Sequence, residues 1–494
     1  MKKFERAVVL TLLVMILILA GCKKMPTSPG NNPPSKPSTP SGPSLGVVDT
    51  TYTFSSFTTD PDDDSISMKF DWGDGSASSW SGLVASGDTI SMGHSYSSTG
   101  IYSIKAQAKD KDGATSGWSD PFQITISSGG TGWERFYGGN YEEVGKWVGQ
   151  TSDGGYMIVG YTTSYGAGAA DAYLVKTDAS GNEIWHSTIG GSQDEWVESA
   201  CKTADGGYIL TGTAYSYDPY WGSDDLYLAK ADANGNEIWH KYFRWGTDST
   251  GAEEWGYSVQ QTTDGGYIIA GFMNNYAQDT LSEVYLIKTD NGGNKLWSKL
   301  FGGPNRDGAY SVQQTSDGGY IIAGWTRSFG AGAQDVYLIK TDANGNETWY
   351  KTFGGPGYDG AYSVQQTSDG GYIIAGYLNS VDIYLIKTDA NGNEVWSKTF
   401  GGADYEEAFS VQQTTDGGYI VAGVTASYGA GVGDVYLIKT DANGNEVWNK
   451  TFGGSNDDTG YWVQQTSDGG YIITGDRQSP PVSGSSDAYL IYYK

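Results

Sequence analysis

The sequence contains very little cysteine and histidine. Cys22 and Cys201 are the two cysteines among its 494 residues, so the chain cannot build a disulfide framework. The three histidines are His94, His186 and His240, and none of them lies in an irregular loop. Catalysis by a Ser-His-Asp or Cys-His arrangement is therefore not expected.

Basic residues are scarce as well. The chain has 30 Lys and Arg against 57 Asp and Glu, which gives a net charge of −27 at pH 7. Nucleic acids and anionic membrane surfaces would be repelled by such a protein. The acidic residues are spread through the chain instead of forming a block, which indicates a solvated acidic surface and not a disordered tail.

Long apolar runs and helical periodicity are absent after residue 22. Glycine is abundant instead, with 73 residues, and so are tyrosine and tryptophan, with 37 and 17. Many glycines between aromatic-rich segments are typical of tight turns that connect β-strands. The composition therefore predicts an all-β protein.

The N-terminus has the pattern of an export signal. Three basic residues precede an apolar run from Ala7 to Ala20, which is shorter than the about 20 residues needed to span a bilayer. The run ends at Leu19-Ala20-Gly21-Cys22, where small residues favour cleavage by a signal peptidase. This segment resembles the lipobox of bacterial lipoproteins. The resemblance implies a signal peptide over residues 1–21 and a lipidated Cys22 that anchors the protein to the membrane.

The residues after Cys22 bear on the location of the anchor. Lys23 and Lys24 follow the cysteine, with no Asp there to suggest retention in an inner membrane, so we expect the outer membrane or the cell surface. Residues 22–44 are rich in Pro, Ser, Gly and Asn, which cannot form a core. This stretch is predicted to be a tether.

Residues 45–128 are predicted to form a small β-sandwich, because they contain short segments of alternating polarity. Phe70-Asp-Trp-Gly-Asp-Gly75, His94-Ser-Tyr96 and Gly100-Ile-Tyr102 resemble the signature of the PKD domain, an immunoglobulin-like module. The resemblance implies a spacer or binding accessory of surface proteins. His94 is interpreted as a structural hydrogen-bonding residue beside the Gly-Asp-Gly turn.

One group of aspartates in this module is compatible with calcium. These are Asp60, Asp62, Asp64, Asp110 and Asp112, which lie in two acidic turns. Calcium takes six to eight oxygen ligands, and paired acidic loops supply them. The alternative is that each Asp forms a turn by accepting hydrogen bonds from its own backbone. Both interpretations stay open.

The rest of the chain is built from a repeat that begins with Asp-Gly-Gly-Tyr. It occurs seven times, at Asp153, Asp205, Asp264, Asp317, Asp369, Asp416 and Asp468. Each copy contains four strand-like segments in about 50 residues, which is typical of a β-propeller blade. The last copy stops at Tyr489–Lys494 without its fourth strand, whereas Trp133–Gly139 stands alone before the first copy. Residues 131–494 are therefore predicted to form a seven-bladed β-propeller closed by its N-terminal strand.

The unit Tyr-Leu-Ile-Lys-Thr-Asp-x-x-Gly-Asn-x-x-Trp resembles the tryptophan-docking repeat of quinoprotein propellers. Its tryptophan occurs seven times, at Trp133, Trp185, Trp239, Trp297, Trp349, Trp396 and Trp448. Quinone-dependent dehydrogenases use adjacent cysteines, and Cys201 is isolated, so no cofactor is expected apart from the open case of calcium. Similar Asp-Gly-Gly-Tyr-Ile repeats occur in surface proteins labelled as endoglucanases, which leaves a glycosidase as an alternative.

The propeller would have one invariant and one variable face. The Ser-Asp-Gly-Gly and Asp-Ala-Asn-Gly-Asn turns of the invariant face are explained by turn chemistry. On the variable face every blade has one carboxylate near the start of its first strand: Glu143, Glu195, Glu254, Asp307, Asp359, Glu406 and Asp458. They would either form an acidic, cation-binding ring at the channel mouth or each bond the backbone of a neighbouring blade.

Blades two and three depart most from the repeat on this face. Their loops bring together five aromatic residues, Tyr217, Tyr220, Trp221, Trp245 and Trp255, with Asp224, Glu253 and Glu254. Aromatic rings flanked by carboxylates suit sugar binding, although the rings could also pack the longer loops. The sequence thus predicts a monomeric, non-catalytic cell-surface lipoprotein that binds a glycan or protein through its variable face. The alternative is a carbohydrate-active enzyme that uses Glu253, Glu254 and Asp224.

Overall fold

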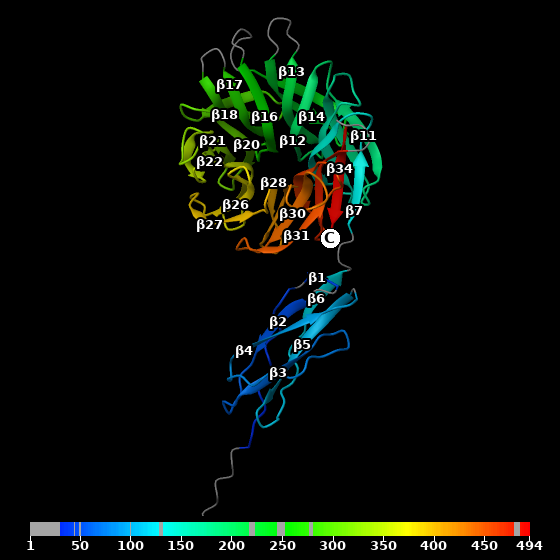
Figure 1. The fold of residues 1–494 in the computed structure, drawn as a ribbon, viewed down its shortest axis with the longest axis vertical. Helices are drawn as coiled ribbons and strands as arrows, with labels where there is room; N and C mark the ends of the chain where they lie inside the picture. The colour runs from blue at the N-terminus through cyan, green and yellow to red at the C-terminus, as the bar shows by residue number, and fades with distance from the viewer. Residues whose placement is uncertain are drawn as a thin grey trace, which may run out of the picture. The chain divides into compact units, whose positions relative to one another are not determined.

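The computed structural model describes residues 30–43, 45–48, 51–98, 100–127, 132–216, 223–244, 252–275, 280–478 and 485–494. These residues form β-strands, turns and irregular segments, and none of them is part of a helix long and apolar enough to cross a membrane. The chain divides into two compact units, Met1–Thr131 and Gly132–Lys494. An all-β fold was predicted from the composition, and it is confirmed (Figure 1).

The first unit is a β-sandwich of two sheets. One sheet has the order β1-β6-β5-β3 and the other pairs β2 with β4. The strands are β1 (Leu45–Val47), β2 (Thr51–Phe57), β3 (Ile66–Asp71), β4 (Thr89–Ser95), β5 (Gly100–Asp110) and β6 (Phe122–Ser127). Alternate residues such as Phe54, Phe70 and Ile104 point inward and are fully buried, as the period of two in a strand requires.

The second unit contains seven four-stranded antiparallel sheets among its described residues, here called sheets 1 to 7. Sheet 1 contains β8 (Glu143–Gln150), β9 (Tyr156–Thr162), β10 (Asp171–Thr177) and β11 (Glu183–Ile189). Sheet 2 contains β12 (Asp194–Lys202), β13 (Tyr208–Ser216), β14 (Ser223–Ala231) and β15 (Glu237–Phe243). Sheet 3 contains β16 (Ala252–Gln261), β17 (Tyr267–Asn275), β18 (Thr280–Thr289) and β19 (Lys295–Phe301).

The remaining sheets repeat this order. Sheet 4 contains β20 (Asp307–Gln314), β21 (Tyr320–Thr326), β22 (Asp335–Thr341) and β23 (Glu347–Phe353). Sheet 5 contains β24 (Gly360–Gln366), β25 (Tyr372–Leu378), β26 (Asp382–Thr388) and β27 (Glu394–Phe400). Sheet 6 contains β28 (Glu406–Gln413), β29 (Tyr419–Thr425), β30 (Asp434–Thr440) and β31 (Glu446–Phe452). Sheet 7 contains β32 (Asp458–Gln465), β33 (Tyr471–Gln478), β34 (Ser486–Tyr493) and, from the start of the unit, β7 (Trp133–Tyr137).

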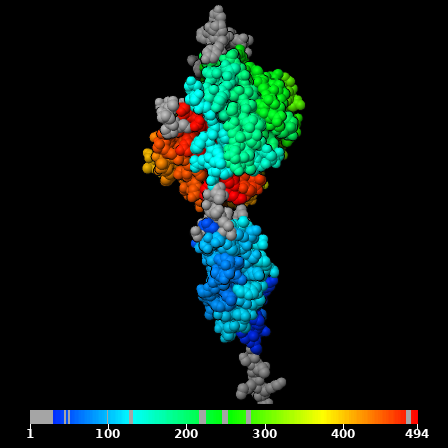
Figure 2. Space-filling model, turned by 90° about the vertical axis from the view of Figure 1, so that its right-hand side faces the viewer, coloured from blue at the N-terminus to red at the C-terminus, as the bar shows by residue number. Residues whose placement is uncertain are grey.

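The first strands of the sheets contact one another around a common centre. Each contacts the first strand of the next sheet, and β32 of sheet 7 contacts β8 of sheet 1. In Figure 1, β12, β16, β20 and β28 lie toward this centre, whereas β11, β27 and β31 lie at the periphery. Figure 2 shows cyan residues from the start of the second unit directly beside red residues from its end, as the pairing of β7 with β34 requires. The backbone N–H of Gln150 donates to Oε1 of Gln464 at 3.0 Å across the junction of sheets 1 and 7.

Tryptophans of the fourth strands pack against the neighbouring sheet. Gly345, in the last turn of sheet 4, has a φ of +75°, and a Cβ placed on it would lie 2.5 Å from the ring of Trp297 in sheet 3. Gly181 of sheet 1 meets Trp133 of β7 in the same way. Glycine at these positions therefore serves both the left-handed backbone and the close approach of the indole.

Candidate functional site

Each first strand of the second unit contains a β-bulge at its centre. The bulge lies between Ala309 and Ser311 in β20, for example, so that Tyr310 has no partner in the adjacent strand. The bulged residues of sheets 1 to 7 are Lys146, Glu198, Tyr257, Tyr310, Tyr362, Phe409 and Tyr461, here called the bulge ring. Bulges re-aim a side chain, and these seven line a central cavity of about 360 Å³.

Five members of the bulge ring are aromatic and contact one another in sequence. The ring centroids are 4.9 Å apart for Tyr257 and Tyr310 and 4.9 Å apart for Tyr310 and Tyr362. Phe409 continues the series at 5.0 Å from Tyr362 and 5.3 Å from Tyr461. Such tilted and edge-on arrangements are the favoured geometries of aromatic pairs.

The other two members form an ion pair. Nζ of Lys146 lies 3.0 Å from a carboxylate oxygen of Glu198 and 4.0 Å from the ring centroid of Tyr461. Burial lowers the pKa of Lys146, but the charge and hydrogen bond of Glu198 together with the charges of Tyr461 and Asp476 outweigh burial, so the net pKa is raised. Lys146 thus connects Glu198 to the aromatic series, because its ammonium group contacts the carboxylate of Glu198 and the ring face of Tyr461.

Two carboxylates lie next to the hydroxyls of the bulge ring. Burial raises the pKa of Asp476 to about 6, and Tyr461 donates a hydrogen bond to it. Oδ1 of Asp476 is buried and has no hydrogen-bond partner among the described residues. Burial also raises the pKa of Glu407, which accepts hydrogen bonds from Tyr405 and Tyr362. The hydroxyls of Tyr461 and Tyr362 therefore bond desolvated acids that do not themselves line the cavity.

The seven carboxylates predicted at the channel mouth are buried at the junctions between sheets. Glu143, Glu195, Glu254, Asp307, Asp359, Glu406 and Asp458 are each at most 1% exposed. Six of them accept a hydrogen bond from a backbone N–H of the glycine-rich connection before their strand, for instance Glu406 from Gly402 at 2.9 Å. These donors stand four residues before the carboxylate, in the connection between consecutive sheets, so the six side chains hold that connection, and the seven carboxylates do not form an exposed ring.

The aromatic sector predicted on sheets 2 and 3 is only partly within the described residues. Tyr217, Tyr220, Trp221 and Trp245 lie outside them. Trp255 is half-buried at the start of β16, and its ring centroid lies 4.8 Å from that of Phe272. The indole donates to Asp224, whose pKa is raised by burial and by the charge of Glu253. The structure thus brings Trp255, Asp224 and Glu253 together.

The bulge ring was not recognised as a site in the sequence. Its members stand three residues after each repeated carboxylate, where five copies have Tyr or Phe and the copies in sheets 1 and 2 have Lys and Glu. That substitution of two aromatic residues by a basic and an acidic residue is the signal that could have identified it.

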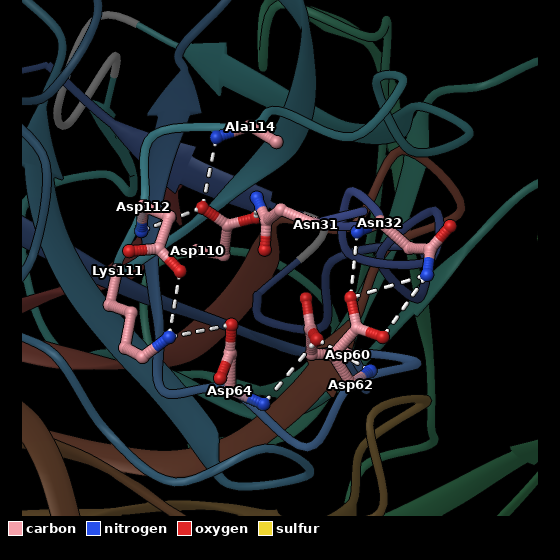
Figure 3. A network of polar contacts seen from close by, with 9 residues as sticks. All are labelled: Asn31, Asn32, Asp60, Asp62, Asp64, Asp110, Lys111, Asp112 and Ala114. Carbon is pink, nitrogen blue, oxygen red and sulfur yellow. Dashed lines mark hydrogen bonds and ion pairs between the residues drawn. The ribbon is translucent and has the colours of Figure 1, made fainter. Parts of the chain in front are cut away.

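The acidic turns of the first unit are held by hydrogen bonds and ion pairs within the protein (Figure 3). Oδ1 of Asp60 accepts from the backbone N–H groups of Asp62 and Asp64, and Oδ1 of Asp110 accepts from Asp112 and Ala114. The other carboxylates accept from amide groups or an ammonium: Asp62 from Asn32, and Asp64 and Asp112 from Lys111.

No three acidic, histidine or cysteine side chains of the described residues converge as metal ligands require. Oδ2 of Asp60 is buried without a hydrogen-bond partner among these residues. The aspartates thus show the hydrogen bonds expected of turn-forming residues, and Oδ2 of Asp60 is the one carboxylate oxygen of this group that is buried without a partner among the described residues.

The three histidines are each paired with one carboxylate. Nε2 of His94 lies 2.7 Å from Asp74, and its ring is stacked on Trp72 with centroids 4.7 Å apart. His186 and His240 contact Glu183 and Glu237 within their own strands. These contacts hold the imidazole rings at the surface of the strands.

Fold and motifs together define the class of the protein: an all-β chain of repeated four-stranded sheets that is preceded by a β-sandwich. Residues 38–120 match the family model of the PKD domain. The PKD domain of an M14-like peptidase from a Thermoplasmatales archaeon is 36% identical, over 20% of this chain and 99% of that one, with a TM-score of 0.19. This module therefore belongs to the PKD domain family, which confirms the resemblance.

Two structures resemble larger parts of the chain. The extracellular domain of a putative hybrid two-component system from B. thetaiotaomicron is 11% identical over 91% of this chain, with a TM-score of 0.40. The chain spans 50% of that protein's length. A β-1,2-mannobiose phosphorylase from Listeria innocua is 11% identical over 60% of this chain and 87% of its own, with a TM-score of 0.26. No curated protein matches the chain.

Proposed function

We propose that this protein is an exported, lipid-anchored surface protein whose seven sheets form a closed β-propeller that binds a glycan. The pairing of β7 with β34, in which Trp133 is opposite Tyr492, supports closure. So do the contacts of β8 with β32 and the hydrogen bond between Gln150 and Gln464. The lipobox-like Leu19–Cys22 supports the anchor.

The observation that carries glycan binding is the composition of the face on which the first strands begin. Trp196 and Trp255 are half-buried here, and the ring centroids of Trp196 and Tyr161 are 4.7 Å apart. Carboxylates accompany the rings, because Asp224 accepts from Trp255 and Glu142 accepts from Tyr161 at 3.0 Å. Aromatic faces and hydrogen-bonding carboxylates are the chemistry that recognises sugar rings and their hydroxyls.

A glycan array probed with the full chain in detergent tests this proposal. We expect binding to at least one glycan, and we expect Trp255→Ala to reduce it by about tenfold or more, because stacking area is lost. Asn344→Ala, in an exposed turn of the opposite face, is the matched control and should bind normally. If the chain bound a protein partner and no glycan, the ligand would be a protein and the proposal of glycan binding would be wrong.

A carbohydrate-active enzyme is the second candidate, and one observation favours it. The pKa of Asp224 is raised by burial and by the charge of Glu253, so Asp224 holds its proton more tightly than an ordinary aspartate and lies close to a second carboxyl group. Paired carboxyls in different protonation states are what glycoside hydrolysis requires. Release of reducing ends from a polysaccharide, lost in Asp224→Asn and Glu253→Gln, would establish this function. If no reducing ends were released from any of a broad panel of polysaccharides, the enzyme would be ruled out in favour of the non-catalytic binding function.

A further inference from the structure

Two glutamines end the first strand of each of sheets 3 to 7, and in sheets 3, 4 and 5 they are bonded differently. The second one is used at both ends in sheet 4: Oε1 of Gln314 accepts from the backbone of Thr263, and its Nε2 donates to the carbonyl of Gly318. Gln366 repeats this pattern in sheet 5. Its Oε1 accepts from the backbone of Ser316 in sheet 4, and its Nε2 donates to the carbonyl of Gly370. Gln261 is bonded in the same way at both ends, whereas Gln413 and Gln465, among the described residues, accept at Oε1 only, so the second glutamines all join consecutive sheets and three of them are bonded at both ends.

The first glutamine of each pair is used at one end only. These residues are Gln260, Gln313, Gln365, Gln412 and Gln464, here called the glutamine tier. Each accepts a backbone N–H of the next sheet at its Oε1, over 2.5 to 3.0 Å. Among the described residues, no group accepts a hydrogen bond from their Nε2 atoms, and these atoms are not enclosed either. Because Oε1 is fixed, the orientation of each NH₂ group is fixed too.

The glutamine tier lines the same central cavity as the bulge ring. One end of the cavity is therefore formed by aromatic rings, and its wall carries amide donors without protein acceptors. Lys146 and Glu198 are the charged residues of this lining, and they neutralise each other at 3.0 Å. At about 360 Å³ the cavity falls within the range of about 300–1,000 Å³ that is typical of small-ligand sites.

We propose that the central channel binds a neutral saccharide unit, a mono- or disaccharide end of the glycan. Sugar hydroxyl and ring oxygens accept hydrogen bonds from the Nε2 groups of the glutamine tier, and one sugar face stacks on the aromatic members of the bulge ring. A neutral ligand matches a lining whose charges are already paired. The inference rests on the proposed function for the ligand class, and it assigns the ligand to a site that the variable loops do not form.

Glutamine-to-glutamate substitutions test this inference with little change of shape. Gln313→Glu with Gln365→Glu keeps the oxygens that accept from Gln366 and Gln413, and it removes two NH₂ donors from the channel. The matched control is Gln314→Glu with Gln366→Glu, which adds the same charge but changes glutamines outside the cavity lining. Titration calorimetry of the full chain with neutral mono- and disaccharides is the measurement. Thermal unfolding checks that each variant is folded.

We expect the channel variant to bind its saccharide at least about tenfold more weakly than the control variant, because ligand oxygens face carboxylates in place of donors. Phe409→Leu should also weaken binding, since it removes one ring of the aromatic end. Equal affinities of the two glutamate variants would overturn the inference. If Trp255→Ala abolished glycan binding while the channel variant bound normally, the proposed function would stand and the channel would not be the site. Absence of binding to any saccharide would overturn both.

Discussion

At the scale of single residues, a threonine hydroxyl donates a hydrogen bond to several of the buried carboxylates between sheets. Thr162 donates to Glu143 at 2.6 Å, and Thr425 donates to Glu406 at 2.6 Å. In sheet 2 the register places Ala214 opposite Glu195, where those threonines stand in their sheets. Burial raises the pKa of Glu195 to about 7, so its ionised form is poorly compensated.

Ala214→Thr should therefore stabilise the protein at pH 8. The folded state holds the Glu195 proton more tightly than the unfolded state, so stability falls as pH rises from about 4.5 to about 7. A threonine hydroxyl that donates to the carboxylate would recover about 1 kcal/mol at pH 8 and less at pH 5. Urea unfolding at both pH values measures the difference. A gain of the same size at pH 5 and pH 8 would contradict this explanation.

The aspartates of the PKD domain lead to a second prediction at this scale. Lys111 already supplies a positive charge between Asp64 and Asp112, and backbone N–H groups satisfy Oδ1 of Asp60 and Asp110. We therefore expect calorimetric unfolding of the full chain to be the same with calcium and with a chelator. A calcium-dependent rise of the melting temperature, by ligand linkage, would show instead that Asp60 Oδ2 belongs to a cation site.

At the scale of elements, the turns between third and fourth strands carry contacts between sheets. Gly345 lies in such a turn, whereas Gly318 lies in the turn between the first and second strands of sheet 4. Both have positive φ angles, of +75° and +83°. A Cβ on Gly345 would meet Trp297 of the preceding sheet, whereas a Cβ on Gly318 would meet nothing within 4 Å. Alanine substitutions at these two glycines therefore distinguish the free-energy cost of the left-handed backbone from the cost of displacing the tryptophan.

Gly318→Ala should cost about 1 kcal/mol of unfolding free energy, because alanine adopts the left-handed conformation poorly. Gly345→Ala should cost clearly more, since it also displaces the indole of Trp297. Urea denaturation of the two variants gives the comparison directly. Equal costs would mean that the tryptophan moves aside freely and that its docking contributes little.

The strand β7 is the second element whose role can be measured. Trp133 contacts Tyr492 and Tyr156, with ring centroids 5.7 and 5.8 Å away, and so joins sheet 7 to sheet 1. Trp133→Ala should cost about 3 kcal/mol, and removal of Trp133–Gly139 should also expose the edge of β34 and promote association. Thermal unfolding and size-exclusion chromatography are the measurements. Unchanged melting and a monomeric profile after the deletion would count against closure by β7.

At the scale of the whole molecule, the proposed lipid anchor would determine where a binding face acts. Cys22→Ser should move the protein from the membrane fraction to the soluble fraction, because acyl chains on Cys22 would supply the membrane affinity. Fractionation of cells that express the two forms is sufficient. The net charge of −27 gives no attraction to anionic lipid, so a serine variant that stayed with the membrane would require another anchor.

Much of this architecture could be predicted from the sequence, because local chemistry is repeated in it. The turn at Asp342, which accepts from the backbone of Asn344 and Asn346, is determined by residues within five positions of one another. The PKD signature around Phe70-Asp-Trp-Gly-Asp-Gly75 is similarly local, and the family match confirms it. Alternation and repeat length were sufficient for the all-β class.

The candidate sites depended on the tertiary structure, because pairing between distant strands creates them. The bulge at Tyr310 arises from its register with β21, and a pattern of alternating residues does not reveal it. Gln313 and Gln314 are equivalent in sequence, yet contacts with the neighbouring sheets leave one amide open to the channel and satisfy the other. The carboxylates predicted at the channel mouth were likewise buried by packing between sheets. Sequence determined which residues repeat, and tertiary structure decided which of them line the central cavity.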